Sequence, residues 1–187
     1  TDDISSINNA VAIGGDIYSP PGIYLISTPI VSSVAGTKFT GSGITSCTFK
    51  QTTLSNRIFE ITDNDIVLEG FSLDYDGTPT VGGDAIWCSG ANADFSGFKI
   101  NRAYNGVVMA GAIIGSIYNF KIYNFVAAGI HLEDVGDIFI DKFLIDAINA
   151  TNGAAGGISM KNFCEAVVVS SGDILNGVYK SEEHTSE

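Results

Sequence analysis

Apolar and polar residues alternate in short runs along most of the chain, the pattern of β-strands that bury one face and expose the other. From Thr37 onward one phrase recurs: a Gly or polar bend, an aromatic residue, a variable residue and an aliphatic residue. A second phrase, small–apolar–x–apolar, is interleaved with it at 85–88, 106–109, 129–132 and 157–160. Each period therefore predicts three short strands, for example Ile66–Leu68, Phe71–Leu73 and Ile86–Cys88.

The period is 22 to 29 residues between the aliphatic positions of the first phrase, which are Ile44, Leu73, Ile100, Ile122, Ile145 and Ile174. A period of this length, with loops of variable size at fixed places, is typical of a solenoid. Strands of successive coils stack ~4.8 Å apart, so equivalent residues form columns. The predicted inward columns are Phe71, Phe98, Phe120 and Phe143, and Ile86, Val107, Ile130 and Ile158. We expect an all-β parallel solenoid of about five coils over residues 37–180. A β-sandwich is the alternative, although it would not produce an aromatic column in phase.

Residues 1–36 follow a different pattern. Ile4, Ile7 and Val11 have helical spacing, and two glycines follow them, so a short helix is expected here. A strand, a Pro-Pro-Gly turn and another strand come next. A short amphipathic helix in front of a solenoid is typical of a cap over the first coil.

Composition supports the β assignment. The chain has 24 Ile and 13 Val but only 7 Leu, and β-branched side chains favour strands over helices. The 22 Gly suit tight bends between short strands. The charged fraction of 16% and the hydrophobic fraction of 45% exclude a disordered chain.

The charge balance excludes one class of partner. With 9 Lys+Arg against 21 Asp+Glu, the net charge is −12 and no basic cluster is present, which argues against a nucleic-acid partner. No apolar run approaches the ~20 residues of a membrane span. Cys47, Cys88 and Cys164 lack the spacing of metal ligands, and we expect them to be small buried residues.

The same alternation predicts outward columns, and these carry the candidate chemistry. Three of them are Glu69, Ser96, Tyr118, Asp141 and Ser170; Asp74, Asn101, Tyr123 and Asp146; and Ser72, Lys99, Lys121 and Leu144. In the first two columns the acids lie three coils apart, about 14 Å. That separation exceeds the ~5–9.5 Å between the paired carboxyl groups of glycoside hydrolases. The strand columns therefore offer no conventional two-carboxylate site.

The best candidate site lies on the strands of the second phrase. His131 and Glu133 both point outward there, with Ser159 and Lys161 one coil below. Glu133 could act as a base, and His131 or Lys161 as an acid or charge stabiliser. Trp87 two coils above would form a sugar platform. Ser159 and Tyr123 are further candidate substrate contacts, and the alternative is an ordinary exposed Glu–Lys pair.

The loop at 74–84 could hold a calcium ion through Asp74, Asp76 and Asp84, although calcium requires six to eight oxygen ligands. An acidic turn is the simpler interpretation, and the expectation is no cofactor.

The opening of the chain resembles the pectate-lyase-like superfamily of single-stranded right-handed parallel β-helices, in the branch of phage tail spikes and rhamnogalacturonase/epimerase-like proteins. The residues that match are Asp2, Asp3, Ile7, Ala10, Gly14, Gly15, Ile17, Tyr18, Pro20, Pro21, Gly22, Tyr24, Ile26, Pro29 and Ile30. Tyr18 and Tyr24 are expected to pack the cap. The motif is structural and brings no catalytic signature with it.

This resemblance implies a right-handed fold and a polysaccharide partner. The expected activity is that of a glycan hydrolase or lyase, and the alternatives are a non-catalytic structural or adhesive β-helix and a carbohydrate epimerase. An extracellular or virion-associated location is implied, and a homotrimer if the protein is a tail spike. Residues 181–187 break the repeat and indicate a non-native tail, and the chain is expected to be the N-terminal part of a longer protein.

Overall fold

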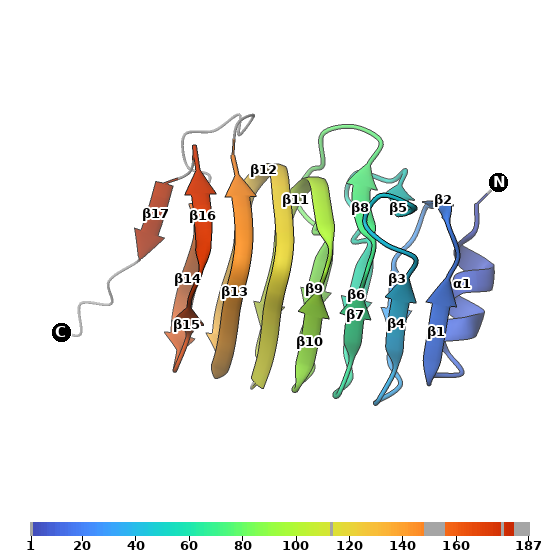
Figure 1. Cartoon of the computed structure of the whole chain (residues 1–187), viewed down its shortest axis with the longest axis horizontal. Helices are drawn as coiled ribbons and strands as arrows, with labels where there is room; N and C mark the ends of the chain where they lie inside the picture. The colour runs from blue at the N-terminus through green and yellow to red at the C-terminus, as the bar shows by residue number, and fades with distance from the viewer. Residues whose placement is uncertain (1, 113, 148–155, 177, 182–187) are drawn as a thin grey trace.

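The computed structural model describes residues 2–112, 114–147, 156–176 and 178–181 (Figure 1). Of the predicted tail at 181–187, Ser181 belongs to the last strand, and residues 182–187 lie outside the described residues. One helix, α1 (Ile4–Val11), precedes the strands, and no helix in the described part of the chain has the length and apolarity to cross a membrane. The strands are β1 (Asp16–Ser19), β2 (Gly22–Ile26), β3 (Ile30–Ser32), β4 (Lys38–Gly41), β5 (Cys47–Gln51), β6 (Phe59–Ile61), β7 (Val67–Glu69), β8 (Ser72–Tyr75), β9 (Ile86–Cys88), β10 (Ala93–Ser96), β11 (Lys99–Ala110), β12 (Ile114–Val135), β13 (Asp137–Asp146), β14 (Gly156–Cys164), β15 (Val168–Val169), β16 (Gly172–Leu175) and β17 (Val178–Ser181).

The strands stack in parallel register into a solenoid whose turns follow one another along its long axis (Figure 1). Each turn contributes to three faces. Face 1 contains β1, β4, β7, β10, the first parts of β12 and β13, and β15. Face 2 contains β2, β5, β8, the first part of β11, the middle of β12, the end of β13, and β16. Face 3 contains β3, β6, β9, the ends of β11 and β12, β14 and β17.

The solenoid has about six turns, where the sequence predicts about five. The difference arises at the start of the chain. The segment β1–β3, predicted as part of the cap region, pairs in register with β4, β5 and β6 and is itself a turn.

Both predicted inward columns are confirmed. Phe71, Phe98, Phe120 and Phe143 are all buried. The rings of Phe98, Phe120 and Phe143 stack, with centroids 5.2 and 5.6 Å apart. The second column is buried and in register through Ile86, Val107, Ile130 and Ile158.

The alignment of Ile44 with the aliphatic column is wrong. Leu73 pairs with Phe49, which in turn pairs with Tyr24. Ile44 lies in a bend at 42–46 that is longer than the later bends between faces 1 and 2, and it is 37% exposed. This longer bend displaces the repeat by five residues (49 − 44 = 5). The column that continues through Leu73 therefore begins with the aromatic rings of Tyr24 and Phe49.

The small residue of the second phrase is required by the close stacking of coils. A Cβ atom at Gly106 would overlap the carbonyl oxygen of Gly129 in the next coil. A Cβ atom at Gly129 would lie 2.7 Å from the carbonyl oxygen of Gly157. The phrase thus marks where the backbone of one coil approaches the next, as well as where a strand begins.

Helix α1 covers the first turn, as predicted. Val11 and Ile4 are buried, and α1 contacts β3. The Asn8 side chain donates to the carbonyl of Pro29 at 3.1 Å and accepts from the Val31 amide at 3.2 Å. Tyr24 stacks on Phe49 with ring centroids 5.1 Å apart. The expectation for the other tyrosine of the opening motif, Tyr18, is wrong, because its side chain points outward from β1 and is 62% exposed.

The cysteines are free thiols. Cys47 and Cys88 are buried as predicted, and Cys164 is partly buried. Burial raises the pKa of Cys47, and it raises the pKa of Cys88 to about 11, so neither is activated as a nucleophile at neutral pH.

Candidate functional site

Trp87, His131 and Ser159, which the sequence places outward, lie in one row on face 3, and Val108 between Trp87 and His131 is only 6% exposed. Trp87 on β9 pairs with Val108 on β11, Val108 pairs with His131 on β12, and His131 pairs with Ser159 on β14. Parallel pairing in register therefore places one of these side chains on each successive turn.

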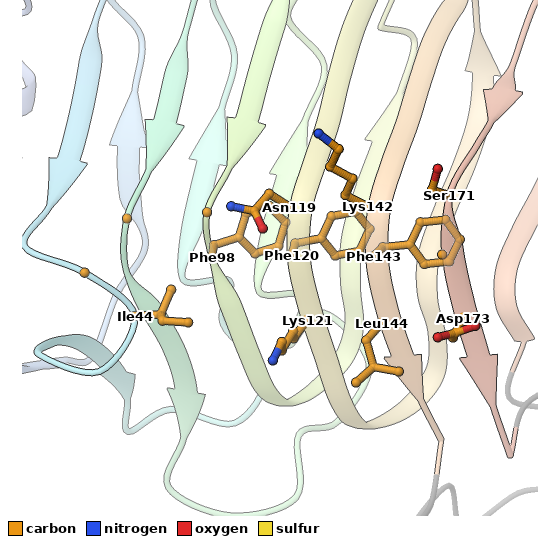
Figure 2. A pocket seen from close by; sticks show the side chains of 14 residues that line it. Ile44, Phe98, Asn119, Phe120, Lys121, Lys142, Phe143, Leu144, Ser171 and Asp173 are labelled. Atoms are coloured by element: carbon orange, nitrogen blue, oxygen red, sulfur yellow. The ribbon is translucent and has the colours of Figure 1, made fainter.

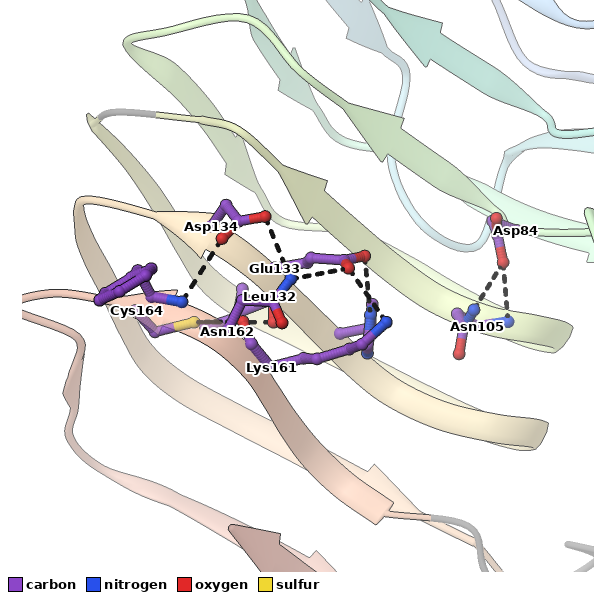
Figure 3. Close-up of polar contacts among 10 residues, drawn as sticks. Asp84, Asn105, Leu132, Glu133, Asp134, Lys161, Asn162 and Cys164 are labelled. Atoms are coloured by element: carbon purple, nitrogen blue, oxygen red, sulfur yellow. Dashed lines mark hydrogen bonds and ion pairs between the residues drawn. The ribbon is translucent and has the colours of Figure 1, made fainter. Parts of the chain in front are cut away.

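Glu133 is the centre of the cluster of polar contacts on this face (Figure 3). The Lys161 ammonium lies 3.1 Å from Oε1 of Glu133, and Nε2 of His131 lies 3.7 Å from Oε2. The Asn162 side-chain amide donates to Oε1 of Glu133 at 3.1 Å and to the Asp134 carboxylate at 3.2 Å. The structure therefore brings together the three residues that the sequence nominates as catalytic. Their side chains remain partly open to solvent, at 32% exposure for Glu133, 23% for His131 and 50% for Lys161.

A cavity of about 300 Å³ adjoins this cluster. His131 and Ser159 line one part of it, and Tyr104 and Asn105 line another. The rest of its lining consists of small residues, Ala127, Ala128 and Gly156. Small side chains at these positions leave a hollow beside the imidazole where larger residues would fill the face.

Asp84 is a functional candidate that the sequence analysis considered only as a calcium ligand. Its Oδ1 accepts hydrogen bonds from the Asn105 side chain at 2.8 Å and the Asn105 amide at 3.3 Å. The residue is buried, and burial raises the pKa of its carboxyl group, opposed in part by the Asn105 hydrogen bonds. The Asp84 carboxylate thereby orients Asn105 at the wall of the cavity (Figure 3). Aligning the positions just before each second phrase would have revealed this pair.

Trp87 is partly covered by another side chain. The Arg57 guanidinium lies over the indole, 4.0 Å from the ring centroid, and also pairs with Glu60 at 3.0 Å. A sugar that stacks on this face of Trp87 would have to displace Arg57 or bind beside it.

Tyr123, the other predicted aromatic contact, does not join this cluster. It lies on the face 2 part of β12, where the Lys99 ammonium is 5.7 Å from its ring centroid. It lines a different cavity from the one beside His131.

The three acids of the 74–84 loop have separate partners. Arg102 binds both oxygens of Asp74, at 3.0 and 2.7 Å, and Lys50 binds Asp76 at 2.7 Å. Asp84 is occupied by Asn105 as described above. Among the residues that the structure describes, no group of three or more His, Cys, Asp or Glu side chains is arranged to hold a metal ion.

The predicted separation of acids in the outward columns is also found. Ser96 and Tyr118 lie between Glu69 and Asp141 in one column, and Asn101 and Tyr123 lie between Asp74 and Asp146 in the other. In place of a pair of carboxylates, the described strands of face 3 provide the Glu133 carboxylate, flanked by the Lys161 ammonium and the His131 imidazole. This set of groups is suited to proton transfer with charge stabilisation.

The chain has detectable likeness to known proteins only at the level of structure. A scan against protein-family models finds no match, and no curated protein matches the sequence. The catalytic domain of a GH87 α-1,3-glucanase, solved in complex with nigerose, superimposes with a TM-score of 0.69 at 16% identity, over 83% of this chain and 30% of that chain. A protein from Parabacteroides merdae, described as a candidate glycosyl hydrolase, superimposes with a TM-score of 0.52 at 12% identity, over 98% of this chain and 93% of that one. This chain spans less than a third of the glucanase chain. The chain therefore has the right-handed parallel β-helix fold, and its structural neighbours include proteins that act on glycans.

Proposed function

We propose that face 3 binds a polysaccharide and that Glu133, His131 and Lys161 take part in cleaving it. The observation that carries this proposal is the Glu133 carboxylate, held between an ammonium at 3.1 Å and an imidazole at 3.7 Å beside a cavity of about 300 Å³. A surface Glu–Lys pair by itself contributes only ~0–1 kcal/mol to stability. The Glu133–Lys161 pair lies beside a cavity that the His131 imidazole lines, and this position favours a functional role.

The contacts suggest a role for each residue. Glu133 is the general base, His131 faces the cavity as the general acid, and Lys161 stabilises negative charge on the carboxylate or the substrate. Asp84 and Asn105 are positioning residues, because Asn105 contacts the cavity and Asp84 holds Asn105. Both hydrolysis and β-elimination can use such a set of groups.

The test is a screen of the whole chain against neutral and acidic polysaccharides, with reducing ends and unsaturated ends measured separately. Reducing ends alone indicate hydrolysis, and unsaturated ends indicate elimination. Replacing the base by its amide, Glu133→Gln, should lower kcat by about 10²–10⁴-fold. Full activity in Glu133→Gln would refute the assignment of the base.

Face 1 provides a matched control. Glu69 pairs with Lys38 at 2.9 Å and accepts from Thr40 at 3.1 Å, so Glu69→Gln breaks the same kind of ion pair away from the site. Activity should be unchanged in Glu69→Gln. If both variants lose activity equally, the effect comes from the fold or the net charge.

A non-catalytic binding module is the second candidate function. It is favoured by the separation of acids in the described strand columns, where no two acids lie on adjacent turns in the manner of a two-carboxylate hydrolase. Binding without new chain ends would support this function, and an unchanged chain length with altered sugar stereochemistry would indicate an epimerase. An extracellular or virion-associated location, with a homotrimer for a tail spike, belongs to the same proposal.

A further inference from the structure

A second concave surface runs along face 2 and the bend between faces 1 and 2. It consists of two cavities of about 590 and 510 Å³ that share Ile44 and Lys121. We call it the face 2 groove. The stacked rings of Phe98, Phe120 and Phe143 form part of its lining (Figure 2). Nothing in the proposed function uses this groove.

The groove gathers lysines that have no carboxylate partner. Elsewhere in the described chain, cationic side chains form ion pairs with acids: these are Lys38, Lys50, Arg57, Arg102 and Lys161. Lys99, Lys121 and Lys142 are in no ion pair among the described residues, and all three line the groove. In a chain of net charge −12, three unpaired lysines on one surface form a distinct electropositive strip.

The lysines are arranged along the solenoid axis. Lys99 and Lys121 are register partners on adjacent strands, ~4.8 Å apart at the backbone. Lys142 follows in the bend of the next turn, one residue before Phe143, which pairs with Phe120. Figure 2 shows Lys121 and Lys142 on opposite sides of the row of phenylalanine rings. An extended ligand that lies along the row would pass between the two ammonium groups.

The acids that line the groove, Asp74 and Asp173, form no ion pair with these lysines. Asp74 lines the groove, but both of its oxygens are bound by Arg102. Asp173 lies at the far end, separated from Lys121 by Leu144 in the same column. Asp173 therefore limits the length of the positive strip.

We propose that the face 2 groove binds an anionic polysaccharide, one that carries carboxylate or sulfate groups along an extended chain. Neutral hydrogen-bonding groups that suit sugar hydroxyls line the groove beside the lysines: they are Thr45, Thr48, Ser72, Asn101, Asn119 and Ser171. Tyr123, 5.7 Å from the Lys99 ammonium, adds an aromatic surface to this end of the groove.

The geometry disfavours other polyanions. A peptide that binds by strand addition needs a free sheet edge, whereas this groove crosses strands that are paired with neighbours in the stack. Duplex nucleic acid carries one charge per ~1.7 Å and is bound through many cations. A strip with one lysine per turn suits a more sparsely charged chain.

The test compares three ligands by calorimetric titration of the whole chain: hexagalacturonate, neutral maltohexaose and poly-L-glutamate. Hexagalacturonate should bind most tightly, and added salt should weaken it. The triple variant Lys99→Gln, Lys121→Gln and Lys142→Gln should weaken binding by about tenfold, because three partly exposed ion pairs are lost. The corresponding triple Lys→Arg variant should retain binding, since it keeps the charges.

Controls separate this groove from charged groups elsewhere on the surface. Lys38→Gln removes one positive charge from face 1, and Lys121→Gln removes one from the groove, so only Lys121→Gln should weaken binding. Glu69→Gln, which removes a negative charge from face 1, should leave hexagalacturonate binding unchanged. Equal binding of maltohexaose, equal binding of poly-L-glutamate, or unchanged affinity in the triple Gln variant would each overturn the proposal. None of these results would bear on cleavage at face 3.

Discussion

Asp84 shows how a single residue gains its role from its surroundings. Its carboxyl group is buried at the start of a face 3 strand, where it fixes Asn105 through two hydrogen bonds. A buried carboxylate without a cation in direct contact is costly, which is why its pKa is raised. Such a group reduces stability once it is ionised, and positions of this kind are often retained for function.

The pH dependence of stability tests this environment. The folded pKa of Asp84 is raised above the unfolded value of ~3.9, so the folded state holds the proton longer as pH rises. The wild type should therefore lose stability relative to Asp84→Asn from about pH 4 upward, until the pH exceeds the raised pKa. Urea unfolding of both proteins across a pH series measures this difference.

Asp76 is a control of opposite sign. Lys50 lowers the pKa of its carboxyl group, so the wild type should be stabilised relative to Asp76→Asn above the unfolded pKa, and this advantage should disappear as pH falls through the folded pKa. A stability difference for Asp84→Asn that does not vary with pH would contradict the burial argument.

At the scale of elements, the solenoid is stabilised by columns that run across turns. The phenylalanine column combines hydrophobic burial with ring stacking at 5.2 and 5.6 Å, and it also supports the face 2 groove from below. No single strand could bury these rings alone, so the stability of each strand depends on its neighbours.

Phe120 and Tyr118 lie on the same strand, β12, and differ in burial. Phe120 is 2% exposed and stacks on both neighbouring rings, so Phe120→Ala should lower the free energy of unfolding by about 3–5 kcal/mol. Tyr118 is 42% exposed, and Tyr118→Ala should change the free energy of unfolding by less than about 0.5 kcal/mol. Chemical denaturation of both variants tests the contribution of the phenylalanine column. Equal losses of stability would show that a ring in the column contributes no more than an exposed ring.

The element scale also shows where sequence patterns fail. The inward columns from Leu73 onward were predictable, because successive bends have similar lengths and strand alternation is local. Strand periodicity alone misaligns Ile44, because it does not encode the length of a bend. The longer bend at 42–46 places Phe49 in the column that contains Leu73. Packing of Phe49 against Tyr24 and Leu73 decides the register there.

At the scale of the whole molecule, a solenoid must close its ends, because the terminal turn has a core with no neighbour. Helix α1 performs this task at the first turn by burying Val11 and Ile4. The Asn8 side chain also links the cap to the first turn. It forms hydrogen bonds with Pro29, just before β3, and with Val31 in β3.

Two substitutions, one at the last residue of α1 and one two residues beyond it, test the cap. Val11 is 1% exposed, and Val11→Asp places a charge in the core, so it should lower the free energy of unfolding by about 3 kcal/mol or more and promote association. Ile13 is 83% exposed, and Ile13→Asp should have little effect on either property. Thermal unfolding with light scattering measures both. A monodisperse Val11→Asp protein of wild-type stability would contradict the capping role.

The amino-acid sequence by itself determined the solenoid, its inward columns and the capping helix. It also determined the alignment of His131 with Ser159 and of Glu133 with Lys161. The reason is that strand alternation and repeat period are local properties of the sequence, and parallel stacking in register places equivalent positions of successive turns side by side. Only the tertiary structure decided which columns share a face. It separated Tyr123 from His131, joined Asp84 to Asn105 and left Lys99, Lys121 and Lys142 beside two cavities without carboxylate partners. The physical reason is that corners and loops set which side chains converge, and their geometry comes from packing between turns, which no local pattern records.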